Sequence, residues 1–237
     1  MKIQERQRLC LEVLGKLPHK FVLIGGYAAS SFDFPRFSVD LDLVVRRKGV
    51  KELTGILEKQ GFRLVQDKGD FSKFYKGRIV RFEKKVDSLP VRVDLFVDMV
   101  QSRQTEAAYS FDYLWRNSEL RRVVGSGVRD SVEARVADRG MLIALKMNSM
   151  RMADQRDIVA FCNGTINRAG ILTHLKRVPK ERILNNIDIF IGTLERPESR
   201  DSIKGVFGIS GKVYGRVIDK AKKEMLSIRR GISGEGA

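Results

Sequence analysis

The stretch Ser38–Val45 alternates between apolar and acidic residues, and this pattern restricts the folds that the chain can adopt. Successive side chains of a β-strand point to opposite faces, so the apolar residues would face a core while Asp40 and Asp42 share the other face. Two neighbouring carboxylates repel each other and disfavour joint ionisation. A divalent cation removes that conflict, and ligands that are all oxygen suit magnesium. The other interpretation is a solvated strand face on which two aspartates meet by chance.

The stretch Val91–Leu95 repeats the alternation and carries a third acidic residue, Asp94. If the two strands are neighbours in one sheet, Asp94 reaches the same site as Asp40 and Asp42. Three carboxylates can hold two magnesium ions, one that activates an attacking hydroxyl and one that binds a triphosphate. The sequence therefore predicts a two-metal site at these residues.

A pair of glycines, Gly25 and Gly26, follows an apolar strand and precedes a predicted helix over Tyr27–Phe34. Glycine lets the backbone approach a phosphate closely, and the start of a helix offers N–H groups to an anion. A Gly-Gly pair alone usually marks only a tight turn. Here the chain then returns to the strand of Asp40 and Asp42, which would place a phosphate-binding turn beside the metal site.

The periodicity of the chain predicts an α+β fold: a mixed β-sheet domain flanked by helices over residues 1–135, then an all-helical C-terminal domain over 136–237. The segment 105–137 has no pattern that we can assign, and Glu195–Ser199 is interpreted as a connection. The other predicted helices cover 3–16, 50–60, 138–152, 154–162, 167–177, 180–195 and 212–229, and strands cover 21–24, 38–45 and 91–97 with a hairpin in 62–86.

Charge and cysteine content narrow the class of protein. Lys and Arg number 45 against 29 Asp and Glu, a net charge of +16 that occurs in both halves of the chain and suggests a polyanionic partner such as RNA or DNA. The alternative to a polyanionic partner is a charge pattern that only serves solubility. Cys10 and Cys162 do not make a disulfide framework, which favours a reduced, cytoplasmic setting. No apolar run approaches the roughly 20 residues of a membrane span, so no membrane partner is expected.

One motif combines the run Gly25-Gly26-Tyr27-Ala28-Ala29 with Arg36, Ser38, Asp40 and Asp42. In residue type and spacing it resembles the first motif of the AbiEii/AbiGii-type nucleotidyltransferase-like toxins, within the DNA polymerase beta-like nucleotidyltransferase superfamily. The resemblance implies a nucleotidyltransferase-type sheet, with Gly25, Gly26 and Ser38 lining the triphosphate and the aspartates binding metal. Arg36 could contact phosphate or pair with a carboxylate.

Weaker stretches extend the resemblance to about residues 20–165, while residues 170–237 resemble nothing that we can name. Arg92 and Asp94 stand where the family has a basic residue and its third carboxylate, and Lys146 and Arg156-Asp157 resemble its helical lysine and Arg-Asp motifs. The resemblance implies a catalytic and nucleotide-binding Lys146 and a nucleotide-binding Asp157.

The distance between Lys146 and Asp157 decides whether they can act together. In an unbroken helix, eleven residues at about 1.5 Å each would separate them by roughly 16 Å. They can serve one nucleotide only if the helix breaks between them, which we expect near Met152–Asp154. Otherwise Lys146 could be a surface lysine and Asp157 could belong to an internal salt-bridge network with Arg151 or Arg156.

Two basic stretches are candidate RNA contacts. In the first, aromatic rings could stack on bases and basic groups could pair with phosphates, although a half-buried hairpin with a charged outer face shows the same alternation. The second, in the C-terminal helix, is interpreted as a solvated face. The first consists of Phe71, Lys73, Phe74, Tyr75, Lys76, Arg78 and Arg81, and the second of Lys220, Lys222, Lys223, Arg229 and Arg230.

Taken together, the residues and the resemblance predict a metal-dependent nucleotidyltransferase with two magnesium ions as cofactors and a nucleoside triphosphate as substrate. The expected acceptor is an RNA end such as tRNA, and the resemblance adds a toxin role with an antitoxin protein as partner. One alternative is a small-molecule or protein nucleotidyltransferase, although a cationic drug would need an acidic pocket that the charge of +16 opposes. Another is a degenerate module that binds a nucleotide or RNA without catalysis.

Overall fold

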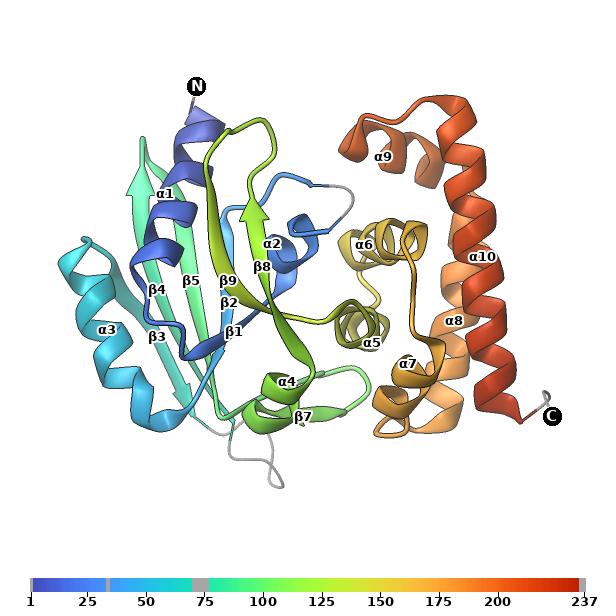
Figure 1. Cartoon of the computed structure of the whole chain (residues 1–237), viewed down its shortest axis with the longest axis horizontal. Coiled ribbons are helices and arrows are strands. Elements are labelled where there is room, and N and C mark those ends of the chain that lie inside the picture. Colours follow the sequence, from blue (N-terminus) through green and yellow to red (C-terminus); the bar gives the residue numbers. More distant parts are fainter. Residues whose placement is uncertain (1, 33–34, 70–76, 235–237) are drawn as a thin grey trace. The chain divides into compact units, whose positions relative to one another are not determined.

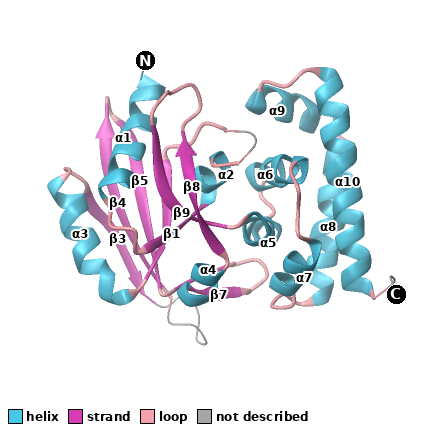
Figure 2. Ribbon diagram, viewed as in Figure 1, coloured by secondary structure: helices cyan, strands magenta, loops and turns pink. Residues whose placement is uncertain are grey.

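The computed structural model describes residues 2–32, 35–69 and 77–234, and its fold is α+β, as predicted (Figure 1). The chain divides into two compact units, and each is described by itself. The first comprises Met1–Gln101 and Ala108–Asp138, and the second comprises Ser102–Ala107 and Arg139–Ala237. Figure 2 shows the strands in the first unit, whereas the second is helical.

The first unit is built on a mixed seven-stranded sheet with the order β3-β4-β5-β2-β1-β9-β8. Strands β2 and β5 pair in parallel, as do β1 and β9, and the other neighbours are antiparallel. The strands of this sheet are β1 (Phe21–Ile24), β2 (Asp40–Val45), β3 (Arg63–Gly69), β4 (Arg78–Val86), β5 (Leu89–Val97), β8 (Ser118–Val124) and β9 (Ser131–Ala137). A separate two-stranded sheet pairs β6 (Met99–Gln101) with β7 (Ala108–Ser110).

Helices α1 and α3 lie on one side of the sheet (Figure 1), and α1 packs on β4, β5 and β9. The alternation in β2 and β5 explains why that face forms a core: Leu41 and Leu43, with Val93 and Leu95, are completely buried. The helices of this unit are α1 (Lys2–Lys16), α2 (Gly25–Ser30), the short 3₁₀ helix η1 (Arg47–Gly49), α3 (Val50–Lys59) and α4 (Phe111–Arg116).

The second unit is a bundle in which α10 packs on α6, α7 and α8, and α5 packs on the same three helices. Its centre is apolar and includes the fully buried Leu142, Phe161, Ile187 and Met225. The helices are α5 (Arg139–Ser149), α6 (Met152–Asn163), α7 (Arg168–Leu175), α8 (Lys180–Leu194), α9 (Pro197–Phe207) and α10 (Gly211–Ser233). Over the part of the chain that the structure describes, none of the helices has both the length and the apolar character needed to cross a bilayer.

Two predicted elements were wrong in their bounds or type. The helix expected over Tyr27–Phe34 begins earlier, at Gly25, and ends at Ser30, while residues 33–34 lie outside the described residues. The expected connection at Glu195–Ser199 contains the start of α9. Pro197 occupies the first turn, where a helix has no need of the missing N–H, and the left-handed Gly208 ends the helix.

Candidate functional site

Strand β2 carries two carboxylates on the face opposite its buried leucines. Asp40 and Asp42 are both half-buried, whereas Leu41 and Leu43 are fully buried. Burial is the main cause that raises the pKa of Asp40; the charge of Arg92 opposes the rise and that of Asp94 adds to it. The shared face predicted from the sequence is therefore present in the fold.

The third predicted carboxylate lies on the neighbouring strand. Strands β2 and β5 run parallel, and their register sets Asp42 directly opposite Asp94 and sets Asp40 opposite Arg92. Neighbouring strands are about 4.8 Å apart, and directly opposite side chains leave the sheet on the same face. The expectation that the two strands are neighbours is confirmed.

The glycine turn is approached closely by the side chains that follow it in the sequence. Gly25 has φ +72°, in the left-handed region, and a β-carbon added there would overlap the carboxylate of Asp42. A β-carbon added at Gly26 would lie 2.5 Å from Oγ of Ser38 and 3.2 Å from a terminal nitrogen of Arg36. The fold thus brings together five residues of the first motif around a backbone that has no side chain of its own.

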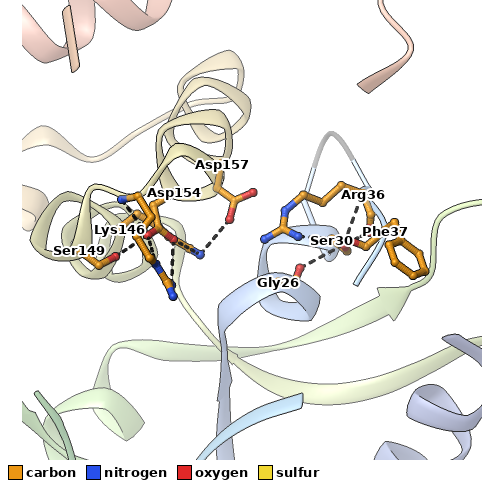
Figure 3. Close-up of polar contacts among 9 residues, drawn as sticks. Gly26, Ser30, Arg36, Phe37, Lys146, Ser149, Asp154 and Asp157 are labelled. Carbon is orange, nitrogen blue, oxygen red and sulfur yellow. Dashed lines mark hydrogen bonds and ion pairs between the residues drawn. The ribbon is translucent and has the colours of Figure 1, made fainter. Parts of the chain in front are cut away.

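Ser30 ties the loop before β2 to the glycine turn. Its hydroxyl lies 3.1 Å from the carbonyl oxygen of Gly26 and 3.1 Å from that of Arg36, and Arg36 donates a hydrogen bond of 3.1 Å to the carbonyl of Phe37 (Figure 3). Ser30 itself is 1% exposed. The backbone on both sides of the motif is therefore held in place by a buried hydroxyl that the sequence did not identify.

Arg81 pairs with the third carboxylate, which the sequence did not predict. Its Nε donates to Oδ1 of Asp94 at 2.7 Å and its Nη2 donates to Oδ2 at 2.6 Å. The sequence offers Arg81 either as part of an RNA platform or as part of the charged outer face of a hairpin, and neither interpretation predicts this pairing. The available signal was the alternation in 78–86, which puts Arg81 on the face opposite the buried Val80 and Phe82.

The carboxylates do not form a ready-made metal cage. Among residues 2–32, 35–69 and 77–234, no group of three or more His, Cys, Asp or Glu side chains is placed so that it could hold a metal ion. The donor chemistry at Asp40 and Asp42 fits a hard divalent cation. The two bonds from Arg81 to Asp94 do not fit a second ion on that carboxylate.

Lys146 lies in a buried ion-pair cluster of the second unit (Figure 3). Its Nζ is 2.8 Å from Oδ1 of Asp154 and 2.9 Å from Oδ2 of Asp157, and the three side chains are at most 8% exposed. Asp154 also accepts hydrogen bonds from Oγ of Ser149 at 2.6 Å and from Nε of Arg151 at 2.8 Å. Every carboxylate of the cluster therefore has a cationic partner.

The helix break that would let Lys146 meet Asp157 is present. Helix α5 ends at Ser149 and α6 begins at Met152, slightly before the expected position. Burial opposes the charge on Lys146, but the carboxylates of Asp157 and Asp154 outweigh it and raise the pKa of Lys146. The interpretation of Lys146 as a surface lysine is wrong. Asp154 was missed, although its position three residues into a helix after Arg151 is a capping position.

The two basic stretches have different outcomes. Residues 71–76 of the proposed RNA platform lie outside the described residues, and Arg78 at its edge donates to Asp67 at 2.6 Å. In the C-terminal helix, Lys220 donates to the carbonyl of Gly164 at 3.0 Å, and Arg229 donates to a carboxylate of the same unit. The ion pair of Arg229 is exposed, which agrees with a solvated basic face, whereas Lys220 is partly buried by its contact with Gly164.

Comparisons with known proteins leave the family of this chain open. No family model matches the chain, and no curated protein matches it. Seven chains of solved structures match it, and two of them are from Helicobacter pylori. A candidate nucleotidyltransferase from H. pylori has a TM-score of 0.48 and 15% identity, over 99% of this chain and 96% of its own. JHP933 from Helicobacter pylori has a TM-score of 0.44 and 13% identity, over 98% and 93% respectively.

Proposed function

We propose that the chain is a nucleotidyltransferase, which moves a nucleotide from a nucleoside triphosphate to an acceptor. One observation carries the proposal: the glycine turn, the Ser38 hydroxyl, the Arg36 guanidinium and the carboxylate of Asp42 converge in one unit, with Asp94 opposite Asp42 on the next strand. Open backbone beside a guanidinium suits phosphate, and carboxylates beside it suit a divalent cation.

The residues have distinct roles in this proposal. Gly25 and Gly26 leave space for phosphate oxygens, and the Ser38 hydroxyl and Arg36 donate hydrogen bonds to them. Ser30 keeps the turn and the following loop at a fixed spacing through the carbonyls of Gly26 and Arg36. Phosphoryl-group transfer depends mainly on such positioning and on stabilisation of charge.

The proposed cofactor is magnesium, with Asp40 and Asp42 as ligands. Bound there, the ion would supply positive charge to the triphosphate and to the departing pyrophosphate. The sequence predicts a second ion on Asp94, and we keep Asp94 as part of the site through its position opposite Asp42. Lys146 and Asp157 stay proposed nucleotide contacts by resemblance only, since their side chains are engaged with each other.

The proposed acceptor is an RNA end, and tRNA is the first candidate. Support comes from the net charge of +16, because Lys and Arg bind phosphates and release counterions. A toxin role with an antitoxin partner is proposed from the resemblance of the first motif. A protein or small-molecule acceptor would leave the positive charge without a purpose in the reaction.

The test is transfer of a radioactive label from each of the four α-³²P-labelled nucleoside triphosphates to total tRNA in magnesium buffer. We expect the α label on the acceptor and no transfer of a γ label. Asp42→Asn should reduce transfer by at least a hundredfold, and so should excess chelator. Asp67→Asn is the matched control, because Asp67 is on the edge strand and pairs with Arg78 instead. Binding of triphosphate without any transfer to tRNA, protein or small acceptors would leave only a nucleotide-binding module.

A further inference from the structure

Two rows of charged side chains cross three adjacent strands on the carboxylate face. The register of β4 with β5, and of β5 with β2, places one residue from each strand in each row. Residues directly opposite on neighbouring strands share a face, so both rows lie together on the side away from the buried core. The first row is Arg81, Asp94 and Asp42, and the second is Glu83, Arg92 and Asp40.

Each row already contains a cation of the chain itself. Arg81 binds both oxygens of Asp94 at 2.7 and 2.6 Å, and Arg92 approaches Glu83 at 3.3 Å. The side chain of Asp94 is only 10% exposed. A bidentate hydrogen-bonded pair of a guanidinium and a carboxylate is among the strong interactions in proteins, and here the carboxylate has little access to water.

The position of Arg81 is set by the sheet and not by a mobile loop. It lies in the middle of β4, between the buried Val80 and Phe82, and its backbone pairs with that of Asp94. The hydrogen bonds that Arg81 donates to Asp94 are the main cause that raises the pKa of Arg81, and the charges of Asp40 and Asp42 add to the rise. All three aspartates therefore lie within the field of this one guanidinium.

A second divalent ion on Asp94 would conflict with this arrangement. Magnesium binds a carboxylate oxygen at roughly 2.1 Å, and the Arg81 nitrogens are 2.6 and 2.7 Å from the two oxygens of Asp94. The ion and the guanidinium would be close neighbours of like charge, with little water between them to screen the repulsion. Asp94 can accommodate one of the two cations at a time.

We propose that Arg81 takes the place of one of the two metal ions, so that the site binds a single divalent cation at Asp40 and Asp42. Asp94 then serves to hold the guanidinium. A guanidinium has five N–H donors, so Arg81 can bind Asp94 and a phosphate oxygen of the triphosphate together. This inference rests on the proposed function, and it assigns Arg81 as a binding residue for the triphosphate.

The test counts bound Mn²⁺ on the full chain, alone and with inorganic tripolyphosphate, which mimics the donor without choosing a base. Equilibrium dialysis gives the number of ions, and electron paramagnetic resonance separates an isolated ion from a coupled pair about 4 Å apart. We compare the wild type with Arg81→Met and with Arg81→Met/Asp94→Asn, which removes the carboxylate left behind. Arg78→Met is the matched control, because it removes another carboxylate-paired arginine of β4. Circular dichroism verifies the fold of each variant.

We expect one isolated Mn²⁺ in the wild type and in Arg78→Met, a coupled pair in Arg81→Met with at least tenfold tighter binding of the second ion, and one ion again in the double variant. A coupled pair in the wild type, or a single ion in Arg81→Met, would overturn the inference. If the wild type holds a pair and still transfers nucleotide, the proposed function survives and only the role of Arg81 falls. If the wild type binds no Mn²⁺ under either condition, the metal site itself falls and takes both proposals with it.

Discussion

Replacing Lys146 by Met should destabilise the protein strongly, whatever its role in catalysis. The ammonium group contacts Asp154 at 2.8 Å and Asp157 at 2.9 Å, and these carboxylates are 0% and 1% exposed. Asp154 would keep the bonds from Ser149 and Arg151, but both carboxylates would lose their shared buried cation. Breaking a buried pair in this way costs about 3–5 kcal/mol in the free energy of unfolding.

A neutral triple variant, Lys146→Met/Asp154→Asn/Asp157→Asn, provides the control for this prediction. It removes the uncompensated charge, so it should recover most of the loss, since buried pairs contribute little beyond an uncharged replacement. Urea unfolding followed by circular dichroism at pH 7 measures all three proteins. A loss of less than about 1 kcal/mol in Lys146→Met would refute the reasoning that the cluster is buried and closed.

The same measurement has a pH dependence with a definite sign. Burial opposes the charge on Asp154, but Lys146, Arg151 and Ser149 outweigh it and hold the pKa of Asp154 well below its ordinary value. A lowered pKa gives stability that is present above the unfolded value of about 3.9 and is lost as pH falls toward the folded value. The raised pKa of Lys146 gives stability that is present below about 10.4 and is lost as pH rises through the folded value. The difference in free energy of unfolding between wild type and Lys146→Met should therefore be largest between about pH 5 and pH 9 and should decrease in acid.

Two further predictions concern the glycine turn and RNA. Gly25→Ala should lower the free energy of unfolding by about 1–2 kcal/mol and abolish triphosphate binding, because the φ of Gly25 is +72° and an added β-carbon would meet Asp42. The control, Gly55→Ala in helix α3, has open space and should be neutral or stabilising by up to about 1 kcal/mol. Equal effects of the two variants in calorimetry would contradict this prediction. RNA affinity measured by anisotropy should fall steeply with salt, and reversing Lys73 and Lys76 to Glu should weaken it at least tenfold while triphosphate binding persists; a flat salt response would remove RNA as the acceptor.

Local patterns predicted most of the fold because they act over a few residues. The alternation in β2 placed its leucines in the core and its aspartates opposite, and the apolar spacing in α3 and α10 gave helices near their observed bounds. The failures have local causes as well. The segment Glu195–Ser199 was interpreted as a connection, but Pro197 begins a helix there. The segment 105–137 gave no assignable pattern because β7 has only three residues, and because β8, at the edge of the sheet, buries only Val123 and so shows no clear alternation.

The candidate site was predictable only as far as its residues share a strand or follow one another. Asp40, Asp42 and the glycine turn form one continuous motif, and the pattern found them. The meeting of Asp42 with Asp94 required knowing that β2 and β5 are neighbours in a given register, which the sequence does not state. Arg81 and Asp154 were missed because their ion-pair partners, Asp94 and Lys146, lie next to them only in the folded chain.

The carboxylates paired with Lys146, which are Asp154 and Asp157, and the carboxylate paired with Arg81, which is Asp94, differ in how firmly these cations hold them. Lys146 is enclosed, with 8% of its side chain exposed, so water cannot replace it and its pairing is part of the structure of the second unit. The side chain of Arg81 is 36% exposed, so solvent and a phosphate oxygen can reach its outer donors while Asp94 keeps hold of it. A loss of activity therefore has different meanings at the two sites. In Lys146→Met it must be corrected for the unfolded fraction, whereas in Arg81→Met it should appear with the protein folded and with a changed number of bound ions. Measuring stability and ion count together on both variants separates a residue that builds the fold from one that serves the triphosphate.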